Sequence, residues 1–151
     1  MLSLSTVIKA PISIVFEWIS DFEKRRQWME GLEDAEFAQP FDPAHPVGAT
    51  FRQPIREGGR VVTYDGEIIA YEPPTHFGVR LSNPEFAMEL DYRLSPLDEQ
   101  ATRLDYQVNT TYMSAFARVM GMLFMWLTRR IAYRQIERLR ERVESAAQEP
   151  A

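Results

Sequence analysis

The side chains that most often carry catalytic chemistry are scarce in this sequence. His45 and His76 are the only two histidines, and there is no cysteine. Thiolate catalysis, disulfide bonds and cysteine-ligated metals are therefore excluded. Each histidine lies near turn-forming prolines, and neither has a second ligand at a spacing typical of metal sites. No local motif indicates a Ser/His/Asp arrangement, a phosphate loop or a dinucleotide fingerprint. We interpret both histidines as surface loop residues and predict no catalytic residue, no metal and no cofactor, which leaves enzymatic activity undecided.

Apolar and aromatic residues follow a clearer pattern. From Phe86 to Leu94 every second residue is apolar, with Glu89, Asp91 and Arg93 between them, and the stretch from Leu104 to Thr110 repeats this alternation. Strict alternation predicts antiparallel strands with one covered face. A long helix after Ser114 is predicted to lie opposite that face. The side chains on this covered face and on the facing side of the helix are the candidates to line a ligand site; they are Tyr64, Phe77, Val79, Leu81, Phe86, Met88, Leu90, Tyr92, Tyr106, Val108, Thr110, Phe116, Met120, Leu123, Phe124 and Leu127.

Two chemical interpretations of this set of side chains, which we call the predicted wall, remain open. Methionine and aromatic side chains adapt to irregular shapes, so the wall suits a flat or greasy ligand. The alternative is an ordinary filled core. A buried tyrosine hydroxyl usually needs a partner, and a ligand carbonyl or hydroxyl is one candidate partner for Tyr92 and Tyr106. The backbone or a water molecule is the other.

The arginines are interpreted mainly as surface residues. Alternation with apolar neighbours predicts that Arg52, Arg56 and Arg80 point to solvent, although an inward arginine would anchor a carboxylate or phosphate. The arginine-rich stretch 129–142 also contains glutamates. Mixed signs at helical spacing favour a solvated face over a membrane-binding one.

The elements that must position these residues are predicted in a definite order. A strand over residues 2–9 ends at Pro11, which favours a helix start. Asp21 is placed to cap a second short helix that ends at Gly31. About six strands follow, up to Tyr112, separated by turn signals at 42–46, 58–59, 73–74 and 82–84.

The last predicted element is one continuous helix, capped by Ser114 and running to about Ala146. The stretch from Val119 to Leu127 is apolar around nearly the whole helix. Met122, Met125 or Trp126 would then form either a homodimer patch or a lipid-facing gate. The favoured alternative is that the two short N-terminal helices cover this stretch.

Composition narrows the functional classes. A chain of 151 residues fits one domain, predicted here as residues 1–147 with a frayed tail at 148–151. The formal net charge of −5 argues against binding to nucleic acid. No apolar run reaches the roughly 18 residues of a transmembrane helix, and no signal peptide is evident. We therefore expect a cytoplasmic protein without a transmembrane segment.

Several short motifs carry a resemblance to a known family. They are Val7-Ile8-Lys9-Ala10-Pro11 with Val15-Phe16, Ile19-Ser20-Asp21 and Trp28, then Glu67 to Pro74, then Ala101 to Tyr106. In this order they resemble the START-like helix-grip superfamily, which holds polyketide cyclases, lipid-transfer domains, coenzyme Q-binding proteins and plant allergens of the birch-pollen type. Within it the chain is most similar to the bacterial polyketide cyclase/dehydrase and lipid transport family. One departure is Ala101, where the family usually has glycine.

The resemblance implies an α+β fold in which a strongly curved antiparallel sheet of about seven strands wraps around the C-terminal helix. It also implies a cavity between them. The leading functional hypothesis is binding or carriage of a small hydrophobic molecule such as a lipid, isoprenoid or aromatic polyketide. The alternatives are a cyclase, aromatase or dehydratase that acts by orienting its substrate, and a protein-interaction module with a filled cavity.

Overall fold

The computed structural model describes residues 2–148 apart from residues 30, 34, 40 and 58. Its elements, in chain order, are β1 (Leu2–Ile8), α1 (Ile12–Ser20), α2 (Phe22–Trp28), β2 (Glu36–Phe37), β3 (Thr50–Glu57), β4 (Arg60–Glu72), β5 (His76–Ser82), β6 (Phe86–Asp98), β7 (Ala101–Tyr112), α3 (Ala115–Leu123) and α4 (Met125–Gln148). Six strands follow the helical pair, as the turn signals predicted. Of the predicted tail, Gln148 ends α4, and residues 149–151 lie outside the described residues.

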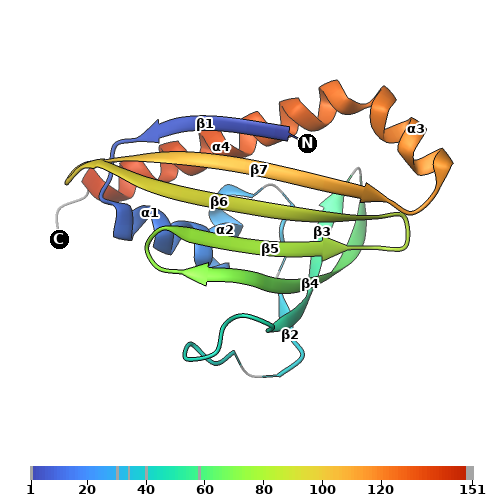
Figure 1. The fold of residues 1–151 in the computed structure, drawn as a ribbon, viewed down its shortest axis with the longest axis horizontal. Helices are drawn as coiled ribbons and strands as arrows, with labels where there is room; N and C mark the ends of the chain where they lie inside the picture. Colours follow the sequence, from blue (N-terminus) through green and yellow to red (C-terminus); the bar gives the residue numbers. More distant parts are fainter. Residues whose placement is uncertain (1, 30, 34, 40, 58, 149–151) are drawn as a thin grey trace.

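All the described strands form one antiparallel sheet in the order β1-β7-β6-β5-β4-β3-β2 (Figure 1). The hairpin between β3 and β4 is present, with Gly59 at a φ of +85°; its other predicted turn residue, Gly58, lies outside the described residues. The positive φ suits glycine because other residues pay a steric cost there. The α+β helix-grip architecture predicted from the sequence is therefore confirmed.

The two short helices are held by the groups that the sequence predicted. Asp21 accepts hydrogen bonds from the backbone N–H groups of Glu23 (2.8 Å) and Lys24 (3.2 Å), so its carboxylate caps α2. The hydroxyl of Thr102 on β7 is fully buried and donates to the carbonyl of Ala10 at 2.8 Å. This bond fixes the joint between β1 and α1 against the sheet.

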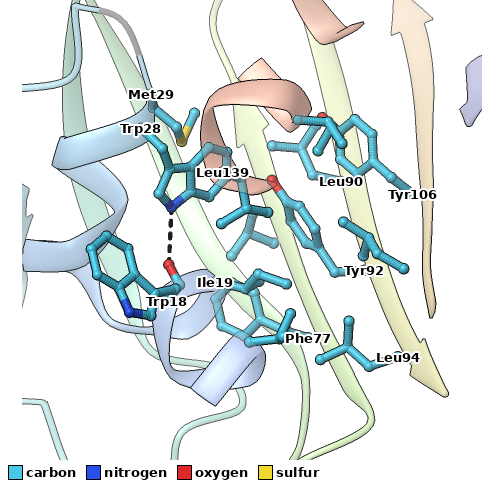
Figure 2. Packing of buried hydrophobic residues seen from close by; sticks show 14 of the residues in the cluster. Trp18, Ile19, Trp28, Met29, Phe77, Leu90, Tyr92, Leu94, Tyr106 and Leu139 are labelled. Carbon is cyan, nitrogen blue, oxygen red and sulfur yellow. Dashed lines mark hydrogen bonds between the residues drawn. The ribbon is translucent and has the colours of Figure 1, made fainter. Parts of the chain in front are cut away.

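The core lies where α1, α2 and the later part of α4 meet one face of the sheet (Figure 2). The helix α4 buries one stripe, made of Ala132, Ile136, Leu139 and Val143. These positions recur at intervals of three and four residues, which keeps them on one side of an α-helix. The helix α3 contributes no buried residue.

The prediction of one continuous C-terminal helix was wrong. Ser114 does cap a helix, since its hydroxyl accepts from the backbone N–H of Ala117 at 3.0 Å. That helix, α3, ends at Leu123, and α4 begins at Met125 in a different direction (Figure 1). Between them Phe124 has φ −104° and ψ 16°, outside the usual helical values.

The predicted cover for the apolar stretch 119–127 was also wrong. The helices α1 and α2 pack against α4, where the buried stripe begins only at Ala132. Met122 and Trp126 consequently remain 70% and 61% exposed.

Candidate functional site

A cavity of about 310 Å³ lies between the sheet and the first half of α4. We call it the inner cavity. Its sheet side is formed by residues of β1 and β3–β7, and its helix side by Thr128, Ile131, Ala132 and Gln135. The sheet-side and loop residues are Leu2, Met29, Ile55, Arg60, Val62, Tyr64, Leu81, Asn83, Glu85, Phe86, Met88, Leu90, Tyr106 and Val108.

A second cavity of about 520 Å³ adjoins the first beneath α3, and we call it the outer cavity. Its helical wall comes from Phe116, Ala117, Met120 and Gly121. The two cavities share four lining residues, which are Glu85, Phe86, Met88 and Thr128. The C-terminal helix breaks at Phe124, and the shared residue Thr128 lies in the first turn of α4 after this break. Its hydroxyl donates to the carbonyl of Phe124 at 3.3 Å. The two cavities therefore meet directly after the break.

Most of the residues predicted to line a ligand site lie on these two cavities. Those on the inner cavity are Tyr64, Leu81, Phe86, Met88, Leu90, Tyr106 and Val108, and those found only on the outer cavity are Thr110, Phe116 and Met120. Three others, Phe77, Val79 and Tyr92, are buried in the core and line neither cavity. The last three, Leu123, Phe124 and Leu127, are exposed and likewise line neither.

This division has a simple structural cause. Residues Phe77, Val79 and Tyr92 share a sheet face with the cavity residues, but they lie where α1 and α2 fill the space. The ring of Phe16 on α1 meets Phe77 edge-on at 6.4 Å, and the ring of Trp28 meets Tyr92 at 6.4 Å. One half of the predicted wall is therefore packed core, and the other half borders the cavities.

Tyr106 connects the two halves. It lines the inner cavity, and its ring packs against Tyr92 with a centroid distance of 4.8 Å (Figure 2). Burial raises the pKa of the Tyr106 hydroxyl well above its ordinary value, Tyr92 raises it further, and Arg25 opposes the change. A phenol with a raised pKa stays protonated near neutral pH, so Tyr106 is suited to donating a hydrogen bond and unsuited to acting as a phenolate base.

Arg25, which sequence analysis passed over, is a buried arginine of α2 with 3% exposure. Its guanidinium donates to the carbonyl of Ile19 at 2.8 Å and to the sulfur of Met29 at 3.2 Å. The guanidinium carbon also lies between 5.4 and 6.0 Å from the ring centres of Phe22, Trp28, Phe77 and Tyr92. Cation–π contacts with these rings replace part of the lost hydration. The sequence did offer one signal for its burial. Arg25 lies three residues before Trp28 in a short helix, so the two side chains share one side of α2.

With the fold and the cavities described, the comparisons with known proteins become informative. The sequence pattern of the family described as "Polyketide cyclase / dehydrase and lipid transport" matches residues 2–144. The chain belongs to this family. No curated protein sequence matches it.

Solved structures similar to this family member share its fold at low sequence identity. The Zhui aromatase/cyclase from Streptomyces sp. R1128 has a TM-score of 0.75 at 16% identity, covering 95% of this chain and 92% of that one. A conserved protein from Geobacillus kaustophilus has a TM-score of 0.73 at 14% identity, covering 95% of both chains. A START superfamily protein from Mycobacterium smegmatis has a TM-score of 0.69 at 17% identity, covering 97% and 96%.

The motifs that carried the resemblance to the family occupy its structural joints. The segment from Val7 to Pro11 ends β1 and leads into α1, and Trp28 ends α2 with its indole N–H donating to the carbonyl of Trp18 at 3.0 Å (Figure 2). The segment from Glu67 to Pro74 is the end of β4 with its following turn. The residues of these two segments and Trp28 serve packing and chain direction, and none of them lines the inner cavity. The third motif, from Ala101 to Tyr106, lies on β7 and does reach that cavity through Tyr106.

The histidines of this family member lie outside both cavities. His45 is exposed in the loop before β3, as predicted, and its Nδ1 contacts the Asp42 carboxylate at 3.1 Å. His76 is not a loop residue; it begins β5, is half-buried, and its Nε2 lies 2.5 Å from Asp91. Among the described residues, no group of three or more His, Cys, Asp or Glu side chains could hold a metal ion.

The surface arginines of the sheet behave as predicted. Arg52, Arg56 and Arg80 are exposed, and each lies near a carboxylate: Asp65 at 3.9 Å, Glu33 at 3.1 Å and Glu89 at 2.6 Å, respectively. None of the three lines the inner cavity. Among the described helices, none is both long and apolar enough to cross a bilayer.

Proposed function

We propose that this protein binds and carries a small hydrophobic molecule in the inner cavity. The observation that carries the proposal is the wall of that cavity, which joins apolar side chains of the sheet to Ile131 and Ala132 of α4 around about 310 Å³. Ligand sites of roughly 300–1,000 Å³ with a mostly apolar lining are typical of small-molecule binding. The family description, which names lipid transport, is consistent with it.

The few polar groups of the wall narrow the ligand class. Tyr106 offers a neutral hydroxyl donor from the inside of the cavity. Thr128 and Gln135 contribute polar groups from the helix side. The Tyr106 hydroxyl already shares a hydrogen bond with Tyr92. An apolar skeleton that carries one carbonyl or hydroxyl group would replace Tyr92 as its partner while burying the rest of the ligand surface. We expect an isoprenoid, lipid or aromatic polyketide of that kind.

A substrate-orienting cyclase or aromatase is the second candidate. The observation that favours it is the combination of Arg60 and Glu85 on the wall of the same cavity, since these two exposed charges could bind polar ends of a reactive chain. Catalysis of that kind depends on holding reacting atoms in the correct geometry. The raised pKa of Tyr106 disfavours a role for this residue as a general base.

Native mass spectrometry of the purified protein, repeated after denaturation in organic solvent, tests the carrier hypothesis. We expect an adduct whose mass reappears as a free apolar molecule. The Met88→Trp variant fills the junction of the two cavities and should lose the adduct. The matched control is Leu97→Trp, because Leu97 is exposed in β6 and lines neither cavity.

A second readout covers a ligand that is lost during purification. Binding of the fluorescent probe N-phenyl-1-naphthylamine should weaken roughly tenfold or more in Met88→Trp and stay unchanged in Leu97→Trp. Circular dichroism and thermal unfolding establish that both variants are folded. A wild-type protein with neither an adduct nor probe binding would contradict the carrier hypothesis.

A further inference from the structure

The helix α3 and the start of α4 expose a set of large apolar side chains. We call this set the α3 surface; its members are Phe116, Met122, Leu123, Phe124, Trp126 and Leu127. Each is at least 39% exposed, and Phe116 reaches 75%. Isolated apolar side chains are common on protein surfaces, whereas a contiguous group of this kind usually marks a contact site for another molecule.

The α3 surface is left uncovered by the way the chain folds. The helices α1 and α2 pack against α4 on the side of its buried stripe from Ala132 to Val143. The helix α3 lies beyond the start of β1 and follows the turn after β7 (Figure 1). Four of its residues, Phe116, Ala117, Met120 and Gly121, line the outer cavity. Phe116 is nevertheless 75% exposed, and Met122 and Leu123 are exposed without lining that cavity.

The charged residues within 113–136, the segment that carries the α3 surface, are all basic. Residues 113–136 contain four arginines, Arg118, Arg129, Arg130 and Arg134, and no aspartate or glutamate, although the whole chain has a net charge of −5. All four arginines are exposed. The first acidic residue of α4 is Glu137. From other elements, Glu85 is the acidic residue that shares the outer cavity with α3.

We propose that the α3 surface docks on an anionic lipid membrane. Interfacial helices combine apolar and aromatic side chains, which enter the boundary between headgroups and acyl chains, with arginine or lysine beside them. Trp126 and Phe116 provide the aromatic anchors, since such rings prefer the membrane interface. Arg129 and Arg130 follow Trp126 within one helical turn and so lie beside it, in reach of lipid phosphates.

Charge argues for a membrane over a second copy of the chain. A two-fold dimer places the same surface patch on both partners. The four arginines of one copy would then approach the four of the other. Residues 113–136 contain no aspartate or glutamate that could pair with them. Like charges at a contact are destabilising. An anionic bilayer supplies the complementary charge and also accepts the apolar side chains.

Docking of this kind does not require a ligand in the inner cavity, so it goes beyond the proposed function. It also has a geometric consequence for that cavity. Phe116, Ala117, Met120 and Gly121 of α3 line the outer cavity, which adjoins the inner one at Thr128. A docked protein would thus hold the outer cavity within one helix diameter of the lipid.

Trp126 makes the proposal directly measurable. Of the three tryptophans, Trp18 and Trp28 are buried and Trp126 is exposed. The experiment adds vesicles of phosphatidylcholine alone, or of phosphatidylcholine mixed with phosphatidylserine, to the full chain. We expect a blue shift of tryptophan emission and co-sedimentation only with the mixed vesicles, both weakened by added salt. The Trp126→Phe variant should still sediment with mixed vesicles but lose the blue shift.

Charge and apolar variants separate the two parts of the surface. Arg129→Gln combined with Arg130→Gln should weaken partition into mixed vesicles roughly 25-fold, at about fivefold for each arginine. Arg142→Gln is the matched control because Arg142 is exposed on α4 among the acidic residues Glu137, Glu141 and Glu144. Met122→Ser combined with Trp126→Ser should weaken partition roughly tenfold or more. All these positions are exposed, so the variants are expected to fold as the wild type does.

Four results would overturn the proposal. The first is a failure of the wild type to bind mixed vesicles, and the second is equal binding of the wild type to both kinds of vesicle. The third is binding of the paired arginine variant to mixed vesicles as strong as that of the wild type. The fourth is a wild-type dimer in analytical ultracentrifugation that Met122→Ser with Trp126→Ser converts to a monomer, which would assign the α3 surface to a second copy of the chain.

Discussion

Gly121 of α3 lies directly against the phenol ring of Tyr112 at the end of β7. The ring occupies the place that a β-carbon at residue 121 would take, with the Tyr112 hydroxyl as the nearest atom. Glycine inside a helix normally weakens it by about 1 kcal/mol relative to alanine. Here the missing side chain lets α3 approach the sheet, which closes one side of the outer cavity.

The effect of replacing Gly121 on the free energy of unfolding should therefore depend in sign on the residue at position 112. In the wild type we expect Gly121→Ala to lower the free energy of unfolding by roughly 1–2 kcal/mol, because the tyrosine ring must move. In a Tyr112→Ala background the same change should raise it by up to about 1 kcal/mol through helix propensity. Urea unfolding of the four proteins forms a double-mutant cycle. Additive effects would show that the contact has no energetic weight.

Arg25 should be important for stability rather than for surface charge. Arg25→Ala removes the donor to the Ile19 carbonyl and leaves a void among four rings, so we expect a loss of about 3–5 kcal/mol. Arg25→Met fills much of the void without burying a charge and should cost less than half as much. Arg26→Ala is the control, because its exposed ion pair with Glu23 is worth about 0–1 kcal/mol. Chemical denaturation measures all three; an equal cost for Ala and Met would contradict the packing argument.

The pKa of Tyr106 predicts a loss of stability at alkaline pH. Because burial raises this pKa in the folded state, the folded protein holds the phenol proton more tightly than the unfolded chain does. The stability that Tyr106 contributes to the folded state is fully present below the pKa of about 10 that the residue has in the unfolded chain. It is lost as the pH rises through the pKa of the folded state. Unfolding free energies measured from about pH 8 to about pH 11.5 should fall less steeply in Tyr106→Phe than in the wild type. Tyr133→Phe, at an exposed position, should follow the wild type.

If the inner cavity binds a ligand as proposed, Tyr106 should favour ligands that carry a carbonyl group over hydrocarbons of the same shape. A ligand carbonyl that accepts from Tyr106 should lose about 1 kcal/mol, or roughly fivefold in affinity, in Tyr106→Phe. A hydrocarbon of the same shape should be unaffected. Fluorescence titration with 9-anthraldehyde and with anthracene compares the two cases. Equal losses for both probes would mean that Tyr106 acts through packing alone.

The sheet and its neighbouring helices were predictable because local signals agree with each other. Alternating apolar residues from Phe86 to Leu94 identify β6, and the cap at Asp21 identifies the start of α2. Turn residues such as Pro73 and Pro74 separate the strands. Each of these signals depends on a few consecutive residues and on general rules of backbone geometry.

The features that escaped prediction depend on contacts between distant residues. The end of α3 at Leu123 follows a run of residues that can all form helix, and the approach of Gly121 to Tyr112 is a tertiary contact. Alternation identified the covered face of the sheet, but it could not tell that helices fill the part around Phe77. Burial of Arg25 likewise depends on rings from α2, β5 and β6 coming together.

The absence of buried residues in α3 separates the part of the chain that holds the fold from the part that faces outward. Core contacts lie at the other end of the sheet, where α1, α2 and the stripe of α4 meet. Most single substitutions on α3 should therefore leave the melting temperature nearly unchanged. Residues of α3 that border the outer cavity can therefore change during evolution at little cost in stability. Related chains can acquire new ligands or new docking surfaces in this way while the fold stays stable.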